Sequence, residues 1–231
     1  MSIRNTLFGG ASLATGIAVS VLAAAAPLPA AAAQTHYNCQ ASALRLNLPL
    51  GQVVDPVVAN PANNPCREDS QSLLSFGNGL GISTGLLTAT TNDQLTDSNA
   101  KVTRLELANL LSLVNLTAKA VRSNAQVAIA PDGTCRLQAG SALVSTVVQG
   151  KQYNTLKTPV DLDVKLLGLV VAKLHLNATL GGRHPTMGKP DPAKVTQRAV
   201  WLEVTDPVLK LTLADLIVGE ASVDRVGSCR H

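Results

Sequence analysis

The stretch AQVAIAPDGTCRLQAGSALVSTVV, residues 125–148, indicates most directly how this chain folds. Two segments rich in Val, Ala and Leu, 125–130 and 135–148, flank the tetrapeptide PDGT. Pro presets one backbone angle and Gly accepts a positive φ, so this tetrapeptide is a strong turn signal. Two apolar segments joined by such a turn predict a β-hairpin.

Strand-like sequence patterns continue on both sides of the hairpin. Apolar and polar residues alternate there with a period of two, which is typical of strands with one buried face. The predicted strands are 41–48, 101–107, 114–121, 160–180 (two strands divided near Gly168), 199–206 and 213–224. The leucines of 102–116 also fit a helical period in part, so a helix over that range is the alternative.

Many short strands separated by turn signals predict an all-β protein, an antiparallel β-sandwich or a related two-sheet fold. An α/β fold needs helices of about 10–15 residues between the strands, and we find none that is convincing. Residues 49–72 contain four prolines and several asparagines with little periodicity, so we expect a Pro/Asn-rich loop there.

The first 33 residues have the form of a secretory signal peptide. Arg4 precedes an apolar stretch from about Leu7 to Ala26, which predicts a signal helix, and small residues follow as far as Ala33. Cleavage between Ala33 and Gln34 leaves residues 34–231 as a single secreted β domain. The alternative is a retained membrane anchor. After signal removal we expect no transmembrane span, because Lys165 and Lys173 interrupt the most apolar later stretch.

All four cysteines follow the predicted cleavage site, at Cys39, Cys66, Cys135 and Cys229. An even number in a secreted chain indicates two disulfides, although spacing alone does not choose among three connectivities. We expect Cys39–Cys66, which ties down the Pro/Asn-rich loop, and Cys135–Cys229, which pins the C-terminal tail to the hairpin. A metal site is disfavoured, because there is no C-x-x-C pair and no His at ligand spacing.

The net charge and the aromatic content limit the classes of partner that this protein is expected to bind. The formal net charge is +4 and the basic residues are scattered. The mature chain has only Tyr37, Phe76, Tyr153 and Trp201 as aromatic residues. A nucleic-acid partner is therefore not expected, because such proteins cluster their basic side chains and stack bases on aromatics. We expect no cofactor.

Two patterns could carry chemistry. GISTG, residues 81–85, matches the G-x-S-x-G nucleophile elbow of serine hydrolases at Ser83, but its surroundings lack the required strand before and helix after the serine. We therefore expect a glycine-rich loop entering a strand. Asp161 and Asp163 share one face of a strand with Lys165, which indicates a solvated strand face rather than paired acids or a calcium site. His175, between Leu174 and Leu176, should face away from both.

Three stretches together resemble a known family. They are NAKVTRLELANLLSLVNLTAKAVRSNAQV (99–127), DGTCRLQAGSALVSTVVQGKQY (132–153) and AVWLEVTDPVLKLTLADLIVGEASVD (199–224). This order of elements resembles the choice-of-anchor P family of secreted actinobacterial proteins. The resemblance implies an extracellular, cell-envelope-associated β protein and brings no catalytic residues with it. The chain departs from the family pattern in ending without an anchor, which speaks against covalent surface attachment.

These observations favour a secreted, non-enzymatic, envelope-associated protein with a structural or interaction role and an unknown partner. Two alternatives remain: an extracellular carrier of a small apolar ligand, which needs an enclosed apolar cavity of about 300 Å³ or more, and a serine hydrolase that uses Ser83. A contact between Ser83 and a histidine would favour the hydrolase.

We expect the secreted protein to begin at Gln34, because the small residues at 31–33 form the cleavage site. N-terminal sequencing of the protein from culture supernatant tests this. A chain that still begins at Met1 and partitions with membranes contradicts the signal-peptide interpretation in favour of an anchor.

Overall fold

A computed structural model describes residues 36–48, 52–61, 64–78, 81–110, 114–129, 131, 135–166, 168–181, 194–206, 208–209 and 211–226. The chain divides into two compact units, residues 1–32 and 33–231, and all described residues belong to the second. Within these ranges the chain forms strands, turns and loops but no α-helix, and so none that could cross a membrane. The predicted signal helix and the cleavage site at Ala33 and Gln34 lie outside the described residues.

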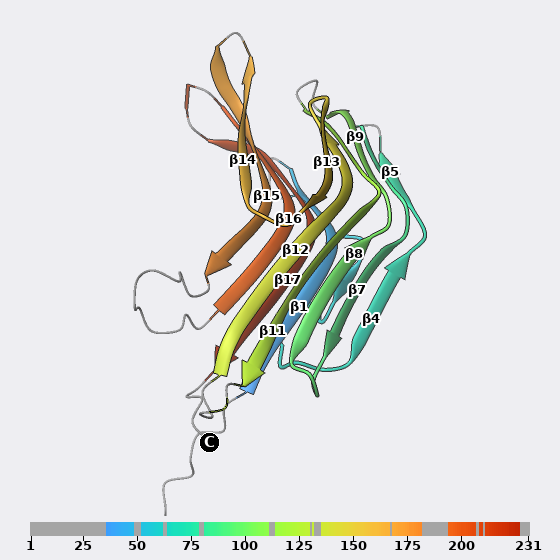
Figure 1. Ribbon diagram of the computed structural model, residues 1–231, viewed down its shortest axis with the longest axis vertical. Coiled ribbons are helices and arrows are strands. Elements are labelled where there is room, and N and C mark those ends of the chain that lie inside the picture. Colours follow the sequence, from blue (N-terminus) through green and yellow to red (C-terminus); the bar gives the residue numbers. More distant parts are fainter. Residues whose placement is uncertain are drawn as a thin grey trace, which may run out of the picture. The chain divides into compact units, whose positions relative to one another are not determined.

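The strands form two antiparallel sheets (Figure 1). The seven-stranded sheet has the order β14-β15-β16-β17-β1-β2, and β3 also pairs with β1. Its strands are β1 (His36–Asn47), β2 (Val53–Val54), β3 (Val58–Ala59), β14 (Val160–Leu166), β15 (Leu169–Gly181), β16 (Lys194–Thr205) and β17 (Thr212–Val226). The N-terminal strand β1 thus pairs along nearly its whole length with the C-terminal strand β17.

The ten-stranded sheet has the order β4-β7-β8-β11-β12-β10-β9-β6-β5, and β13 also pairs with β12. Figure 1 shows β12, β11, β8, β7 and β4 side by side, with β17 and β1 of the other sheet behind them. The strands of the ten-stranded sheet are β4 (Asp69–Leu73), β5 (Phe76–Asn78), β6 (Ile82–Thr84), β7 (Leu87–Asn92), β8 (Asp97–Val102), β9 (Leu105–Leu110), β10 (Val114–Ala118), β11 (Ala120–Ile129), β12 (Cys135–Val148) and β13 (Lys151–Leu156).

The two sheets pack face to face over one large apolar core. β17 contacts β8 and β11, while β1 contacts β7 and β8. The core is built mostly from Leu, Val and Ala, and many of its leucines are fully buried. Each such leucine contributes about 1.5–3 kcal/mol by leaving water, so side-chain burial between the sheets is the main stabilising term. The predicted all-β sandwich is confirmed.

Several finer expectations can now be compared with the structure. The hairpin at 125–148 is present as β11 and β12, whose residues pair from Ala120↔Val144 to Ile129↔Cys135. The described residues of 102–116 form strands and a short connection rather than a helix, because β9 and β10 both pair within the ten-stranded sheet. The strand predicted over 101–107 is divided between β8 and β9, which lets Val102 and Leu105 both face the core.

The Pro/Asn-rich loop expected over 49–72 is wrong in part. Two valine-containing segments within it, β2 and β3, pair with the edge of β1, and Asp69–Leu73 pairs with β7. β2 and β3 are too short to show periodicity, and Asp69–Leu73 is too polar. They form because neighbouring strands offer unpaired backbone groups at the sheet edges.

A reversal of the strand faces crosses the seven-stranded sheet. In each of the strands β15, β16, β17 and β1, two consecutive residues point into the sandwich, where strict alternation would allow one. The strand register places one residue of each such pair in a single cross-strand row: Asn177, Ala199, Gly219 and Ala43. Asn177 and Gly219 in this row have positive φ angles of 56° and 67°. Along each of these strands, the odd-numbered and even-numbered residues exchange faces at the row. Positions of the parity that points into the core before the row point outward after it.

Gly219 lies where the two sheets approach closely. A Cβ at this position would lie 3.3 Å from Ala199 Cβ, 3.3 Å from Ser123 Oγ and 3.4 Å from Val121 Cγ1. Ser123 and Val121 belong to β11 of the opposite sheet. Both the backbone conformation and the space available therefore favour glycine here.

We expect Gly219→Ala to lower the free energy of unfolding by about 2–4 kcal/mol, from left-handed backbone strain plus overpacking. Gly150→Ala is the matched control, because Gly150 also has a positive φ of 81° but nothing within 4 Å of its would-be Cβ. It should cost only the backbone term, about 1–2 kcal/mol. Equal losses in urea unfolding would show that the close approach at Gly219 is unimportant.

Candidate functional site

Ser83 lies in the middle of a strand and not at a nucleophile elbow. β6 pairs with β5 on one side and β9 on the other, which places Ser83 opposite Gly77 and Glu106. Its side chain is exposed. The expected loop before Ser83 is therefore wrong in part, because Phe76–Asn78 forms a strand. The sharp strand-to-helix turn that exposes a nucleophilic serine is not formed here.

The Cys39–Cys66 disulfide is present, with the two Cα atoms 4.7 Å apart. It joins β1 to the segment before β4, and Asn60 supports the same segment by donating hydrogen bonds to the carbonyl oxygens of Cys39 and Pro65. Cys135 is also disulfide-bonded. Cys229 lies outside the described residues, so its pairing with Cys135 stays a prediction.

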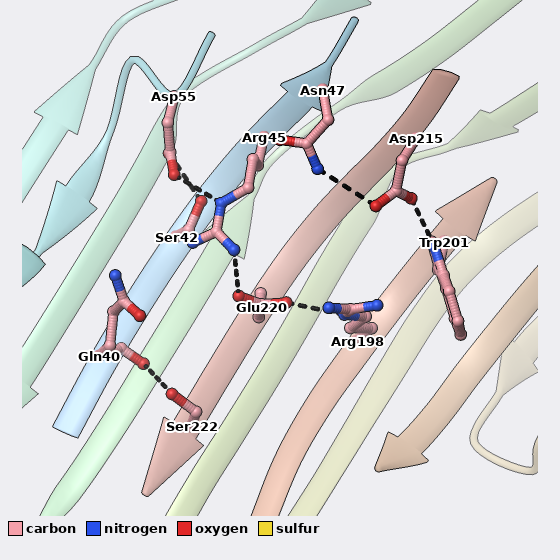
Figure 2. A network of polar contacts seen from close by, with 10 residues as sticks. All are labelled: Gln40, Ser42, Arg45, Asn47, Asp55, Arg198, Trp201, Asp215, Glu220 and Ser222. Atoms are coloured by element: carbon pink, nitrogen blue, oxygen red, sulfur yellow. Dashed lines mark hydrogen bonds and ion pairs between the residues drawn. The ribbon is translucent and has the colours of Figure 1, made fainter. Parts of the chain in front are cut away.

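The outer face of the seven-stranded sheet carries a connected row of polar side chains (Figure 2). Glu220 on β17 accepts hydrogen bonds from Arg45 Nη1 at 2.8 Å and from Arg198 Nε at 2.7 Å. Arg45 Nε also donates to Asp55 at 2.8 Å, and Ser42 Oγ donates to the same carboxylate at 2.7 Å. We call these five residues, Ser42, Arg45, Asp55, Arg198 and Glu220, the ion-pair row.

The ion-pair row is largely shielded from water. The Glu220 side chain is 7% exposed, and the two arginine side chains are 18–20% exposed. The face reversal at Gly219 brings the ion-pair row together. Glu220 and Arg45 lie on opposite sides of the cross-strand row that contains Gly219, and the reversal turns both side chains to the outer face of the sheet. Glu220 therefore bridges two half-buried guanidinium groups, and Asp55 gives Arg45 a second carboxylate contact.

Trp201 continues the row toward β15. Its indole lies under the Arg198 guanidinium, which is 4.6 Å from the ring centroid, and its Nε1 donates to Asp215. Asp215 in turn accepts from Asn47 at 3.2 Å. His175 stacks on Trp201 with 4.7 Å between ring centroids, and its Nδ1 lies 2.6 Å from Asp161 Oδ1.

The predicted outward orientation of His175 is confirmed, but its two partners were not foreseen. Asp161 is 76% exposed, as expected for a solvated strand face, and still reaches the histidine. Asp163 and Lys165 are exposed on the same strand. Ser83 belongs to the other sheet, and the side-chain hydrogen bond of His175 goes to Asp161.

Burial and the neighbouring charges shift the pKa of two members of the ion-pair row, Asp55 and Arg45. Burial raises the pKa of the Asp55 carboxyl, although hydrogen bonds from Arg45 and Ser42 oppose this. For Arg45, burial lowers the pKa, but the charge of Glu220 and the contacts with Asp55 raise it by more, so the guanidinium stays charged. A carboxyl whose pKa rises on folding stabilises the fold less as pH increases through that range. Deprotonation of Asp55 therefore lowers the free energy of unfolding as the pH rises through its pKa.

The outer face of the ten-stranded sheet is hollowed by two open grooves. The first, of about 550 Å³, crosses β8, β11 and β12; we call it the cationic groove, and its lining includes Asn99, Lys101, Arg122, Asn124, Gly140 and Ala142. The second, of about 500 Å³, is lined among others by Lys119 and by Arg104, which pairs with Glu106 at 3.1 Å. Neither has the enclosed apolar form that a carrier of an apolar ligand needs.

Lys101 and Arg122 face each other across adjacent strands of the cationic groove. They are directly opposite in the β8–β11 register, and both are exposed. Neither has an ion pair or hydrogen bond through its side chain in the described part of the chain. Like charges directly opposite in an antiparallel pair destabilise it. This pair is therefore retained against a local energetic cost.

A resident metal has no ligand set in the part of the chain that the structure describes. No three His, Cys, Asp or Glu side chains gather there closely enough to hold an ion. His36 is exposed near the start of β1, while His184 and His231 lie outside the described residues.

Comparison with known proteins gives no relative from which a function could be carried over. The chain matches no protein-family model, no curated protein and no solved structure. The site must therefore be interpreted from its own geometry.

Sequence reasoning missed both the ion-pair row and the cationic groove. Arg45 and Glu220 are 175 residues apart, so no local spacing relates them. One signal was available: Glu220 is a lone carboxylate inside the apolar stretch LIVGEASV, and a charge there needs a buried partner. For the groove, the signal needed was the register between β8 and β11, which the sequence does not provide.

We expect Glu220→Gln to lower the free energy of unfolding by about 3 kcal/mol, because it leaves the half-buried Arg198 without its carboxylate and Arg45 with Asp55 as its remaining carboxylate contact. Glu106→Gln makes the same change in the exposed pair with Arg104, and should cost less than about 1 kcal/mol. Chemical unfolding of both variants at pH 7 measures the difference. A loss at Glu220 no greater than at Glu106 would mean that the row does not stabilise the fold.

Proposed function

We propose that this protein is a secreted, non-enzymatic protein that associates with the cell envelope and acts there by binding. The observation that carries the proposal is the cationic groove, where two unpaired positive side chains stand side by side over an open hollow. Uncompensated like charges on a rigid sheet are the expected form of a surface that meets a negatively charged partner.

Three further observations support this function. The Cys39–Cys66 disulfide favours an oxidising, extracellular compartment, in keeping with the signal peptide predicted over residues 1–33. The strand position of Ser83 speaks against the serine hydrolase alternative. The resemblance to choice-of-anchor P proteins supports association with the envelope, although it names no partner.

Cosedimentation tests the proposal. Purified protein from culture supernatant should pellet with washed envelope fragments of the producing bacterium, and moderate salt should release it because the contact is electrostatic. Serum albumin is the control for non-specific trapping. Full recovery in the supernatant at low salt contradicts envelope association. Ester or peptide hydrolysis that Ser83→Ala abolishes contradicts the non-enzymatic role.

A further inference from the structure

We propose that the cationic groove binds an extended anionic chain of sugars or polyols, whose phosphate or carboxylate groups lie between Lys101 and Arg122. The inference rests on the proposed function and specifies the chemistry of its partner. It starts from the local electrostatics of three neighbouring strands, β8, β11 and β12.

The first argument is the absence of an internal counter-charge. Among the described residues, no carboxylate lines the cationic groove. Along β8 the next acidic residue on the same face is Asp97, four residues from Lys101 and opposite Gln126. Four residues of strand span about 13 Å, which exceeds the screening length of about 10 Å at 0.1 M salt. An external oxyanion between the two cations therefore removes a repulsion that the fold leaves uncompensated.

The second argument is the space beside the two cations. Gly140 and Ala142, on β12, stand opposite Asn124 and Arg122 in the register. Because both are small, the groove is open at this strand, and a ligand chain can lie close to the backbone. Gly140 has an ordinary negative φ, and a Cβ built on it would meet only Asn124 Oδ1 at 3.5 Å. The hollow is therefore not a requirement of the backbone geometry.

The third argument concerns the kind of polyanion. Asn99 and Asn124 stand directly opposite each other, in the row next to the two cations. Their amides can both donate to and accept from sugar hydroxyl groups. No aromatic side chain lines the groove, whereas binding of single-stranded nucleic acid depends on bases stacked on aromatics. A hydroxyl-rich anionic chain fits this lining better than a nucleic acid does.

Calorimetric titration of the full secreted protein tests the inference. The probes are poly(glycerol phosphate) as a phosphate chain, polygalacturonate as a carboxylate chain, neutral dextran, inorganic phosphate and a single-stranded oligonucleotide. At least one anionic sugar or polyol chain should bind, with an affinity that falls as salt increases. Tighter binding of poly(glycerol phosphate) than of polygalacturonate identifies phosphate as the preferred oxyanion, and the opposite order identifies carboxylate. Inorganic phosphate alone should bind far more weakly than the preferred chain.

Three groove variants and one matched control locate the site. Lys101→Gln and Arg122→Gln should each weaken binding about tenfold, the loss of one charge-assisted hydrogen bond. Gly140→Val fills the hollow without changing the charge and should weaken binding as strongly. Lys173→Gln removes one positive charge from β15 of the other sheet and should leave binding unchanged. Thermal unfolding of each variant confirms that it is folded.

Several outcomes overturn the inference: no binding of either anionic chain, equal binding of dextran, tighter binding of the oligonucleotide, or equal weakening by Lys173→Gln. The envelope association is judged separately. If the three groove variants still pellet with envelope fragments as the parent protein does, the groove assignment is wrong and the envelope function stands. If the parent binds an anionic chain through the groove but does not pellet, the envelope function is wrong and the groove assignment stands.

Discussion

The close approach of β17 to β11 at Gly219 is the constraint on which the sandwich depends. A Cβ there would lie 3.3 Å from Ser123 Oγ and 3.4 Å from Val121 Cγ1 of the opposite sheet, so the close approach of the two sheets favours glycine at this position. Polar contacts between the sheets cluster beside it. Gln197 donates to Ser141 Oγ at 2.6 Å, and Ser141 donates to Asn177 at 2.7 Å. These groups are paired, so their burial does not leave them unsatisfied, whereas the buried Ser123 Oγ beside them has no hydrogen-bond partner among the described residues.

The same row of residues explains the polar outer face of the seven-stranded sheet. Strict alternation would place Glu220 and Arg45 on opposite faces, and the reversal at the row brings both outward. The resulting ion-pair row contributes little net stability, because taking charges out of water costs nearly as much as their attraction returns. The leucine core supplies most of the stabilisation. The ion pairs instead select one strand register, since any slip leaves an unpaired charge.

The two sheets therefore use charge in opposite ways. On the seven-stranded sheet each arginine of the row has a carboxylate within 2.8 Å, so this face is electrostatically self-contained. On the ten-stranded sheet Lys101 and Arg122 have none, and small residues leave a hollow beside them. A face whose charges are already paired has little to offer a charged partner, whereas an uncompensated pair on a rigid scaffold does. This contrast is the reason for placing the binding surface on β8, β11 and β12.

Features that depend on local periodicity and turn chemistry could be predicted from the amino-acid sequence alone. The hairpin at 125–148, the break at Gly168 and the all-β class follow from alternation and strong turn residues, and the Cys39–Cys66 pair follows from a loop too polar to pack down unaided. The choice of neighbouring strands belongs instead to the tertiary structure. Cross-strand register depends on contacts between residues as far apart in the chain as His36 and Val226, and local propensity carries no record of such pairs. The pairing of Arg45 with Glu220, the meeting of His175 with Asp161, and the opposition of Lys101 and Arg122 all arise at that level, because the two side chains of each pair belong to different strands and meet only when those strands pair in register.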